Sequence, residues 1–355
     1  MQRGDKMKQI KKIFIAILIT AFSAGIIIFS DKISSSVFQS INICLEVIIP
    51  STFIFMVLSS YILSSGLYDI LFRPFYHPVE RIIKTDRYII SVFLLSLIGG
   101  YPVGFKLLRE LIAENENYSA IAPFCATFCY CISPSFAVTM LGLGMFGSIE
   151  AGLIIYFSNV ITCFIIAIFY GKTHQLKVIT EKNNTPISHN GKLTDSINTS
   201  VISLMKMCSV IIFFNSVITV FECFCDKTKI PFPTALKAVL EISNILKLEA
   251  LSPVALPYIS ALASLGGICV IFQCKSLIDK SFSLKPFLLS RFFTSIIAFA
   301  VTNLIMIFWD ISIPSSHFGS NSYTFNFSTN KAATVFLLIM CIILMQKNEK
   351  NLKKG

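Results

Sequence analysis

Long apolar runs separated by short polar connectors dominate the pattern along the chain. A helix needs about 20 predominantly apolar residues to cross a bilayer, and most of these runs approach or exceed that length. The pattern therefore predicts an all-α polytopic membrane protein with about eight transmembrane helices. The expected spans are residues 13–29, 43–63, 120–146, 149–170, 201–221, 253–274, 287–309 and 332–345.

One apolar stretch, residues 88–98, is too short to cross a bilayer alone. Glycine and proline at its end break a helix, and non-helical backbone at membrane depth persists only inside protein or beside a cavity. We therefore expect a re-entrant hairpin that enters and leaves on one side. A second hairpin, or a segment lying at the interface, is expected at residues 231–251. The break comprises Gly99, Gly100, Tyr101, Pro102, Val103 and Gly104.

Two further interruptions fall inside apolar runs. One is Ser133, Pro134 and Ser135, and the other is the pair Gly266 and Gly267. The second pair ends a Ser-Leu-Gly-Gly run that repeats the Ser-Leu-Ile-Gly-Gly run of residues 96–100 in the other half of the chain. Glycine-interrupted hydrophobic segments at matching places are typical of the binding sites of secondary transporters. The sequence therefore predicts two related halves whose breaks meet near the midplane.

Composition narrows the class further. Hydrophobic residues make up 54% and charged residues 14% of the chain, with a mean hydropathy of +0.74. A soluble domain carries roughly 25% charged residues. A cytosolic enzyme, a disordered protein and a secreted disulfide scaffold are therefore excluded, and the lipid bilayer is the expected surroundings. Most of the 11 cysteines lie in apolar runs, where a free thiol packs as a small hydrophobe.

The net charge of +11 follows the topology of the chain. Basic residues gather before the first span, in the connector 66–87, in the loop 171–200 and after residue 346. Cytoplasmic segments of membrane proteins are rich in Lys and Arg, so both termini are expected in the cytoplasm and no nucleic acid is expected as a partner. The loop 171–200 falls on that side only if residues 88–112 form a hairpin rather than a crossing.

These features divide the chain into five parts. The first and last are basic and the third is a cytoplasmic loop, whereas the second and fourth are the two repeats. The expected boundaries are 1–42 for the N-terminal basic segment and first span, 43–171 for the first repeat, 172–200 for the loop, 201–346 for the second repeat and 347–355 for the tail.

Residues 100–107 read Gly-Tyr-Pro-Val-Gly-Phe-Lys-Leu. They closely resemble the Gly-Tyr-Pro-x-Gly-x-Lys-Leu signature of the YlbJ-type sporulation integral membrane proteins, a branch of the nucleoside-recognition (Gate) domain family. The likeness covers about residues 45 to 345, with Cys129, Tyr130 and Cys131 standing where the family tends to have polar Asn-type residues. Further matches in family order are residues 133–136, 142–146, 240–244 and 264–267, with Gln273 and Arg291.

The resemblance implies a transporter of a spore-forming bacterium. That branch is associated with carrying dipicolinate across the outer forespore membrane, so a small-molecule anion is the expected substrate and the cell membrane or outer forespore membrane the expected location. The family is similar to concentrative nucleoside carriers, so a nucleoside-type carrier is the first alternative. A membrane scaffold for spore assembly that transports nothing is the second.

A rigid aromatic dianion would need cations, amide donors and a flat surface. Lys106, Arg109 and Arg291 are the candidate cations, because ionisable residues within spans are costly and an Arg fork grips a carboxylate by two bonds. The half-helix that starts near Phe105 would add its positive end, and Tyr101 could stack on the ring. On the structural alternative, Lys106 and Arg109 reach out to the interface and the breaks are packing kinks.

The second half contributes polar rather than basic side chains. Glu241 could bind a coupling proton or cation, or could face water on an amphipathic helix. The neutral alternative substrate would depend more on Asn244 and Gln273. The predicted substrate site comprises Gly99, Gly100, Tyr101, Pro102, Gly104, Lys106, Ser133, Pro134, Ser135, Glu241, Asn244, Gly266, Gly267, Gln273 and Arg291.

No motif indicates an enzyme. The four histidines lie in polar connectors, without cysteine or carboxylate at metal-ligand spacing, and there is no Walker A lysine. We therefore expect no cofactor and no metal, and transport not driven by ATP hydrolysis in this chain. A homo-oligomer stays open.

Overall fold

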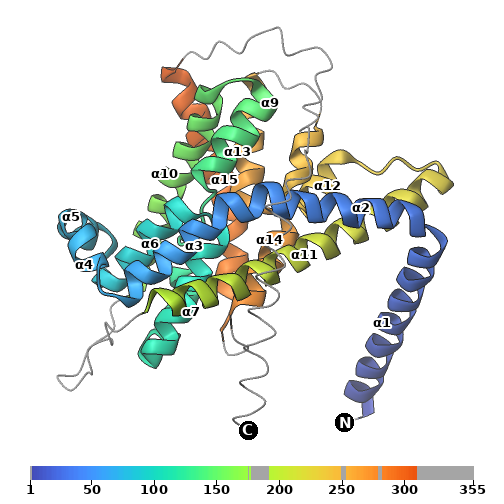
Figure 1. Ribbon diagram of the computed structural model, residues 1–355, viewed down its shortest axis with the longest axis horizontal. Coiled ribbons are helices and arrows are strands. Elements are labelled where there is room, and N and C mark those ends of the chain that lie inside the picture. The colour runs from blue at the N-terminus through green and yellow to red at the C-terminus, as the bar shows by residue number, and fades with distance from the viewer. Residues whose placement is uncertain (1, 175, 177–191, 249–252, 279–281, 310–355) are drawn as a thin grey trace.

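The structure is a computed structural model that describes residues 2–174, 176, 192–248, 253–278 and 282–309. The regular elements of this part of the chain are all helices, and an isolated bridge joins Thr85 and Leu176. The predicted all-α class is therefore confirmed for the described residues. Helices α10 (Ile149–Thr173), α13 (Leu256–Leu265) and α15 (Lys285–Phe308) stand side by side, while α2 (Ser30–Ile43), α3 (Ile49–Ser64) and α11 (Leu193–Thr228) run across them (Figure 1).

The chain begins with two helices that meet at a sharp bend. Helix α1 (Gln2–Ile28) and helix α2 (Ser30–Ile43) are inclined by 93° at Phe29. The apolar side chains of α1 are largely exposed, and the helix points away from the rest of the protein (Figure 1). The expected first span, 13–29, thus ends at the bend.

The second expected span, 43–63, starts earlier than predicted. The helix runs from α2 through the π-helical turn η1 (Cys44–Ile48) into α3 (Ile49–Ser64). Pro50 lacks the N–H that would bond to the preceding turn, and a widened turn accommodates such a residue without ending the helix. The polar residues before Ile43 did not indicate that the helix had already begun.

The predicted polar connector, 66–87, also contains helices. It folds into α4 (Tyr68–Leu71) and α5 (Arg73–Ile83), with the charged side chains of α5 on one face. The other face buries Tyr76, Val79 and Ile83, which recur at helical spacing. The connector is therefore an amphipathic helix packed on the body rather than an irregular loop.

The short apolar stretch forms a helical hairpin, as expected. Helix α6 (Arg87–Gly99) begins at Asp86, whose carboxylate accepts a bond from the Ile89 N–H, and α7 (Tyr101–Glu114) follows Gly100. Gly100 has φ +87°, which glycine adopts without steric cost. The rings of Tyr88 and Tyr118 lie 6.1 Å apart, so the start of α6 adjoins the chain just after α7. We call Gly100 the first break.

The next apolar run is interrupted over a longer stretch than predicted. Short helices η2 (Glu116–Ala120) and α8 (Ala122–Cys125) precede a non-helical segment at residues 126–133, the second break. The chain then continues as the π-helix η3 (Phe136–Leu143), α9 (Gly144–Phe146) and α10 (Ile149–Thr173). Residues 128–132 of the break are at most 2% exposed, as non-helical backbone inside a membrane requires.

The second part of the described chain follows a similar order. Helix α11 starts eight residues before the expected position, because residues 193–200 extend the helix inside the stretch assigned to the loop. Helix α12 and the 3₁₀-helix η4 fold back on each other at Glu241, and α13 and α14 are separated by Gly266, the third break. The elements are α11 (Leu193–Thr228), α12 (Thr234–Leu240), η4 (Ile242–Lys247), η5 (Pro253–Ala255), α13 (Leu256–Leu265), α14 (Gly267–Leu277) and α15 (Lys285–Phe308).

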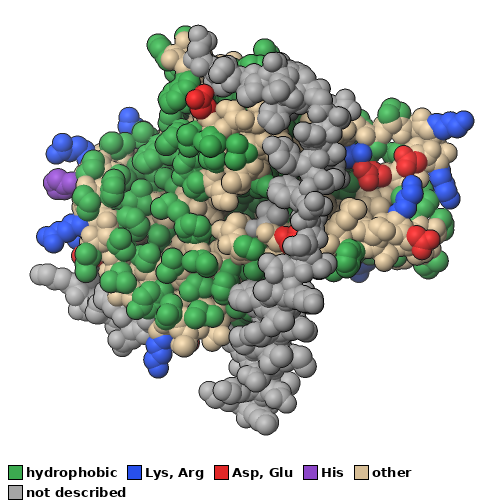
Figure 2. Space-filling view, turned by 45° about the horizontal axis from the view of Figure 1, so that its top comes forward, with side chains coloured by type: hydrophobic (Ala, Val, Ile, Leu, Met, Phe, Trp, Pro, Cys, Tyr) green, Lys and Arg blue, Asp and Glu red, His purple; other side chains and the backbone are tan. Residues whose placement is uncertain are grey.

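Several helices are long and apolar enough to cross a membrane. In the described part there are four, or five if the bent pair α1–α2 forms one span. Hydrophobic side chains cover a broad face of the molecule, with Lys, Arg and His at its edge (Figure 2). An α-helical membrane protein is thus supported, whereas the number eight stays a prediction and the expected span 332–345 lies outside the described residues. The four are Ile149–Thr173, Leu193–Thr228, Pro253–Leu277 and Lys285–Phe308.

Candidate functional site

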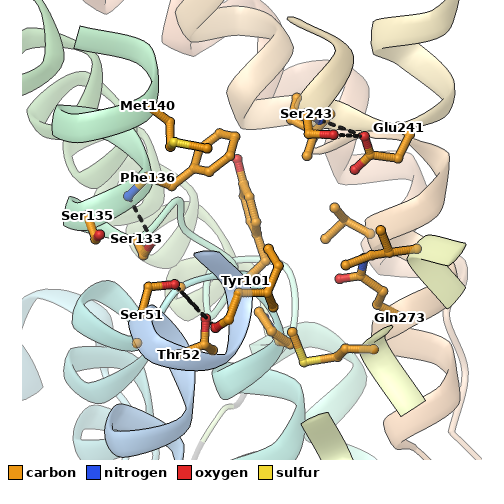
Figure 3. A pocket seen from close by; sticks show the side chains of 18 of the residues that line it. Ser51, Thr52, Tyr101, Ser133, Ser135, Phe136, Met140, Glu241, Ser243 and Gln273 are labelled. Carbon is orange, nitrogen blue, oxygen red and sulfur yellow. Dashed lines mark hydrogen bonds between the residues drawn. The ribbon is translucent and has the colours of Figure 1, made fainter. Parts of the chain in front are cut away.

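A cavity lies where the breaks in the helices meet (Figure 3). It holds about 100 Å³ of enclosed space, or about 730 Å³ with its open mouth included. Its walls come from α3, the tip of the α6–α7 hairpin, the second break and η3, α11, η4 and α14. Segments that are far apart in the sequence therefore share one space.

The tip of the hairpin supplies one wall of the cavity. Gly99, Gly100, Tyr101 and Pro102 all line it, as the sequence predicted. A Cβ on Gly100 would lie 3.0 Å from the Cβ of Ser133, so the first and second breaks are in direct contact. The structure thus brings these predicted residues together, and their binding of a substrate stays a prediction.

The second break adds hydroxyl groups and an aromatic ring. Ser133 and Ser135 line the cavity, and the Phe136 N–H donates to the Ser133 Oγ over 3.3 Å at the start of the helix. Pro134 starts the helical turn between the two serines and is not part of the lining. Phe136 and Met140 project from η3 on the same side (Figure 3).

Polar groups of the second half face them across the cavity. Glu241 and Ser243 come from the turn into η4, and Gln273 comes from α14 (Figure 3). The Glu241 carboxylate accepts bonds from the Ser243 N–H at 2.9 Å, from the Ser243 hydroxyl and from the Asn244 amide at 3.4 Å. Asn244 is therefore a support for Glu241 rather than a lining residue.

Sequence reasoning missed several lining residues. Ser51 and Thr52 lie on α3 with their hydroxyls 3.3 Å apart, directly after Pro50. A proline followed by two hydroxyl residues inside an apolar run could have indicated a polar site on this helix. Phe136 and Ile242 lie in stretches that were noted only for their likeness to the family, and the other apolar lining residues carried no local signal: Ile48, Met140, Met207, Ile211 and Val270.

The three breaks are joined at the end of α13. Helix ends leave carbonyl groups without intrahelical partners, and here that end is buried. The Tyr101 hydroxyl donates to the Ala263 carbonyl, and the Tyr130 hydroxyl donates to the Leu265 carbonyl at 3.4 Å. The Arg291 guanidinium donates to the Ser264 carbonyl between them, also at 3.4 Å.

Arg291 belongs to this junction and not to the cavity. Its residue is 3% exposed, and its guanidinium lies 4.5 Å from the centre of the Tyr130 ring and 4.7 Å from that of Phe287. It also donates to the Thr127 carbonyl in the second break. In the part of the chain that the structure describes, Arg291 forms no ion pair, so carbonyls and rings hold its charge.

Three predicted glycines serve close packing instead of lining the cavity. A Cβ on Gly104 would come 1.9 Å from the Cys129 carbonyl oxygen, and one on Gly266 would come 1.7 Å from the Tyr130 hydroxyl. Gly267 has φ +74°, and a Cβ there would lie 3.2 Å from the Val239 carbonyl oxygen. These positions let the breaks approach each other.

Lys106 also lies away from the cavity. Its ammonium forms an ion pair with Glu110 at 2.9 Å and donates to the Met56 carbonyl at 3.4 Å. Arg109 is exposed on another face of α7. The expected cluster of cations around the substrate is therefore not assembled at this cavity, because helical spacing directs Lys106 toward α3 beyond the hairpin tip.

The lining is suited to reversible binding. It combines hydroxyls, the Gln273 amide and aromatic and thioether surfaces, and Glu241 is the single charged residue among the lining residues that the structure describes. Within the same residues no three His, Cys, Asp or Glu side chains group to hold a metal ion. Such a site can orient a small planar polar molecule by hydrogen bonds and stacking.

Comparisons of the chain with protein-family models, with curated proteins and with solved structures found no match. The resemblance to the YlbJ-type proteins therefore rests on the motifs of the sequence.

Proposed function

We propose that the protein is a membrane carrier that moves a small polar solute by alternating access. The observation that carries this proposal is the meeting of broken helices from both parts of the chain around one cavity. Secondary transporters bind their substrates between discontinuous helices in this way. A protein that served only as a scaffold would have no need for buried breaks, which are costly to satisfy.

Two related halves would follow from the order of the elements. A hairpin, a broken helix and a long helix occur as α6–α7, α8 to η3 and α10, and again as α12–η4, α13–α14 and α15. In this order the tip at Gly100 corresponds to the turn at Glu241, and Gly266 corresponds to the second break. The two Ser-Leu-Gly-Gly runs would then occupy different places in their halves.

We propose a neutral, planar, hydrogen-bonding solute of the nucleoside type as the cargo. The cavity presents hydroxyl groups and one amide, whereas Lys106 and Arg291 are engaged outside it. The Glu241 carboxylate would accept a bond from a hydroxyl or N–H of such a solute and would repel a carboxylate. This reverses the order of the two substrates that the sequence suggested.

Dipicolinate remains the second candidate because the N-terminal end of α7 reaches the cavity at Tyr101 and Pro102. The positive end of a helix attracts anions, and its first N–H groups are donors. On this alternative the protein would act in the outer forespore membrane, with both termini in the cytoplasm.

Uptake of radiolabelled uridine and of radiolabelled dipicolinate into proteoliposomes tests the proposal, with and without proton or sodium gradients. Wild-type protein should take up the nucleoside in a saturable manner, and Glu241→Gln should reduce that uptake about tenfold, as expected for one lost hydrogen bond to a charged group. For dipicolinate the same substitution should raise uptake.

Glu222→Gln is the matched control, because this carboxylate pairs with Lys237 at 2.5 Å and does not line the cavity. It should leave uptake unchanged. Folded protein that takes up neither solute under any gradient would reject both candidates and leave the scaffold alternative.

A further inference from the structure

A second hollow lies beyond the ion pair of Lys106. It encloses about 640 Å³, its open side included, between α3, α7 and the start of α11. We infer that this hollow is a vestibule that gives the solute cavity a second way to the surface, apart from its own mouth, and that the Lys106–Glu110 ion pair is the gate between them. The inference rests on the proposed carrier function. The polar lining of the vestibule is Ser60, Ser64, Glu110, Glu114, Asp195, Ser196 and Thr199.

Helix α7 connects the two hollows along one face. Pro102, Lys106, Glu110 and Glu114 are spaced four residues apart, and residues at this spacing lie above one another on a helix. Pro102 lines the cavity, whereas Glu110 and Glu114 line the vestibule. The rise of an α-helix puts roughly 18 Å between the first and last of them.

Helix α3 carries a matching stripe. Thr52 lines the cavity, Ser64 lines the vestibule, and Met56 and Ser60 lie between them at the same spacing. Lys106 donates to the Met56 carbonyl, and the Ser60 hydroxyl donates to Glu110 at 2.8 Å. The two stripes therefore face each other and are joined at the level of the ion pair.

Helix α11 supplies the third side. Thr199 lines the vestibule, Met207 and Ile211 line the cavity, and Ser203 occupies the intervening position. Three helices thus lead from one hollow to the other. Each of these helices has residues in both hollows.

The path is closed between the hollows. Met56, Lys106 and Ser203 are at most 3% exposed, whereas the Glu110 side chain is 21% exposed. Lys106 therefore lies on the closed side of the pair and Glu110 on the vestibule side. Opening requires α7 to move against α3, because the bonds from Lys106 to Met56 and from Ser60 to Glu110 join the two helices across this path.

A thiol-labelling experiment tests the gate without any solute. Thr199→Cys in the vestibule and Ser203→Cys in the closed path between the hollows are treated in proteoliposomes with a charged, membrane-impermeant methanethiosulfonate, and the parent chain gives the background of native cysteines. Thr199→Cys should react quickly and Ser203→Cys slowly. Adding Glu110→Gln removes the charge that pairs with Lys106, so labelling at position 203 should rise at least tenfold.

Glu222→Gln, which breaks the Lys237 ion pair, should leave labelling at position 203 unchanged. The inference is overturned if Thr199→Cys does not react, or if labelling at position 203 stays slow with Glu110→Gln in folded protein. Because the labelling needs no solute, its result stands even if the carrier proposal fails.

A second variant covers the case in which Glu110→Gln does not fold. Lys106→Met combined with Glu110→Leu replaces the pair by apolar side chains of similar size, a change that buried ion pairs often tolerate. It should keep the path between the hollows closed, so that uptake falls at least tenfold while equilibrium binding of uridine in detergent is unchanged. Lys106→Arg as a single substitution keeps the ion pair with Glu110, and uptake by this variant should be close to that of the wild type. Wild-type uptake by the apolar variant would contradict the gate.

Discussion

Lys106 and Arg291 are two buried cations with different surroundings. Lys106 has a carboxylate partner 2.9 Å away and lies between two hollows. Arg291 is held by the carbonyls of Thr127 and Ser264 and by two aromatic rings. Both looked like anion-binding groups in the sequence, and neither lines the cavity. A charge inside a membrane protein therefore takes its role from its neighbours, here an ion pair in one region and the joining of helix ends in the other.

Removing Arg291 should cause the largest loss of stability. Arg291→Met leaves the carbonyls of Thr127 and Ser264 buried without their donor, and each such loss costs about 1–3 kcal/mol. Thermal unfolding in detergent should show a drop of several degrees or failure to fold. Arg291→Lys should recover only part of it, because a lysine lacks the planar fork.

Arg109→Met is the matched control, since this arginine is exposed on α7. It should change the free energy of unfolding by less than about 0.5 kcal/mol. Equal effects at both positions would mean that the junction at the end of α13 does not depend on Arg291.

A methyl group at Gly104 should disturb the contact between the first and second breaks. Its Cβ would meet the Cys129 carbonyl oxygen at 1.9 Å, and backbone cannot rotate away as a side chain can. We expect Gly104→Ala to lower the free energy of unfolding by about 1–3 kcal/mol or more. The matched Gly144→Ala, whose nearest neighbour is the Thr139 carbonyl oxygen at 3.5 Å, should be close to neutral in the same denaturation assay.

Tyr130→Phe should separate the hydroxyl of the junction from its ring. The ring and its contact with Arg291 remain, whereas the bond to the Leu265 carbonyl is lost. The expected cost is about 1 kcal/mol in unfolding. A loss as large as that of Arg291→Met would show that the hydroxyl, not the cation, holds the third break.

The sequence indicated the lining residues at the helix breaks better than it indicated the roles of the charged residues. Glycine and proline act locally, so the residues at 99–102 and the serines at 133 and 135, which were predicted to share a site, all line the cavity. The roles of Lys106 and Arg291 depend on Glu110 in the next turn and on Tyr130 and Phe287 in the packed fold. Met207 and Ile211 were missed because an apolar side chain in an apolar helix gives no local sign of what it faces.

The helix boundaries were likewise predicted well where the signal is local and poorly where it depends on packing. The span 149–170 was predicted nearly as it is, because an uninterrupted apolar run is sufficient evidence for a helix. Helix α5 was taken for a connector because its charged face dominates the composition, and the burial of Tyr76, Val79 and Ile83 is a property of its spacing. Composition alone therefore hides amphipathic helices.

The most direct test of the central claim is equilibrium binding of labelled uridine to the purified protein. Wild-type protein should bind it saturably, and Gln273→Leu, which removes a lining amide while keeping similar volume, should weaken binding about tenfold. Lys275→Leu, a substitution two residues further along α14 and outside the lining, should bind as wild type does. Binding that is unchanged in Gln273→Leu and reduced in Lys275→Leu would contradict a solute site at the meeting of the breaks.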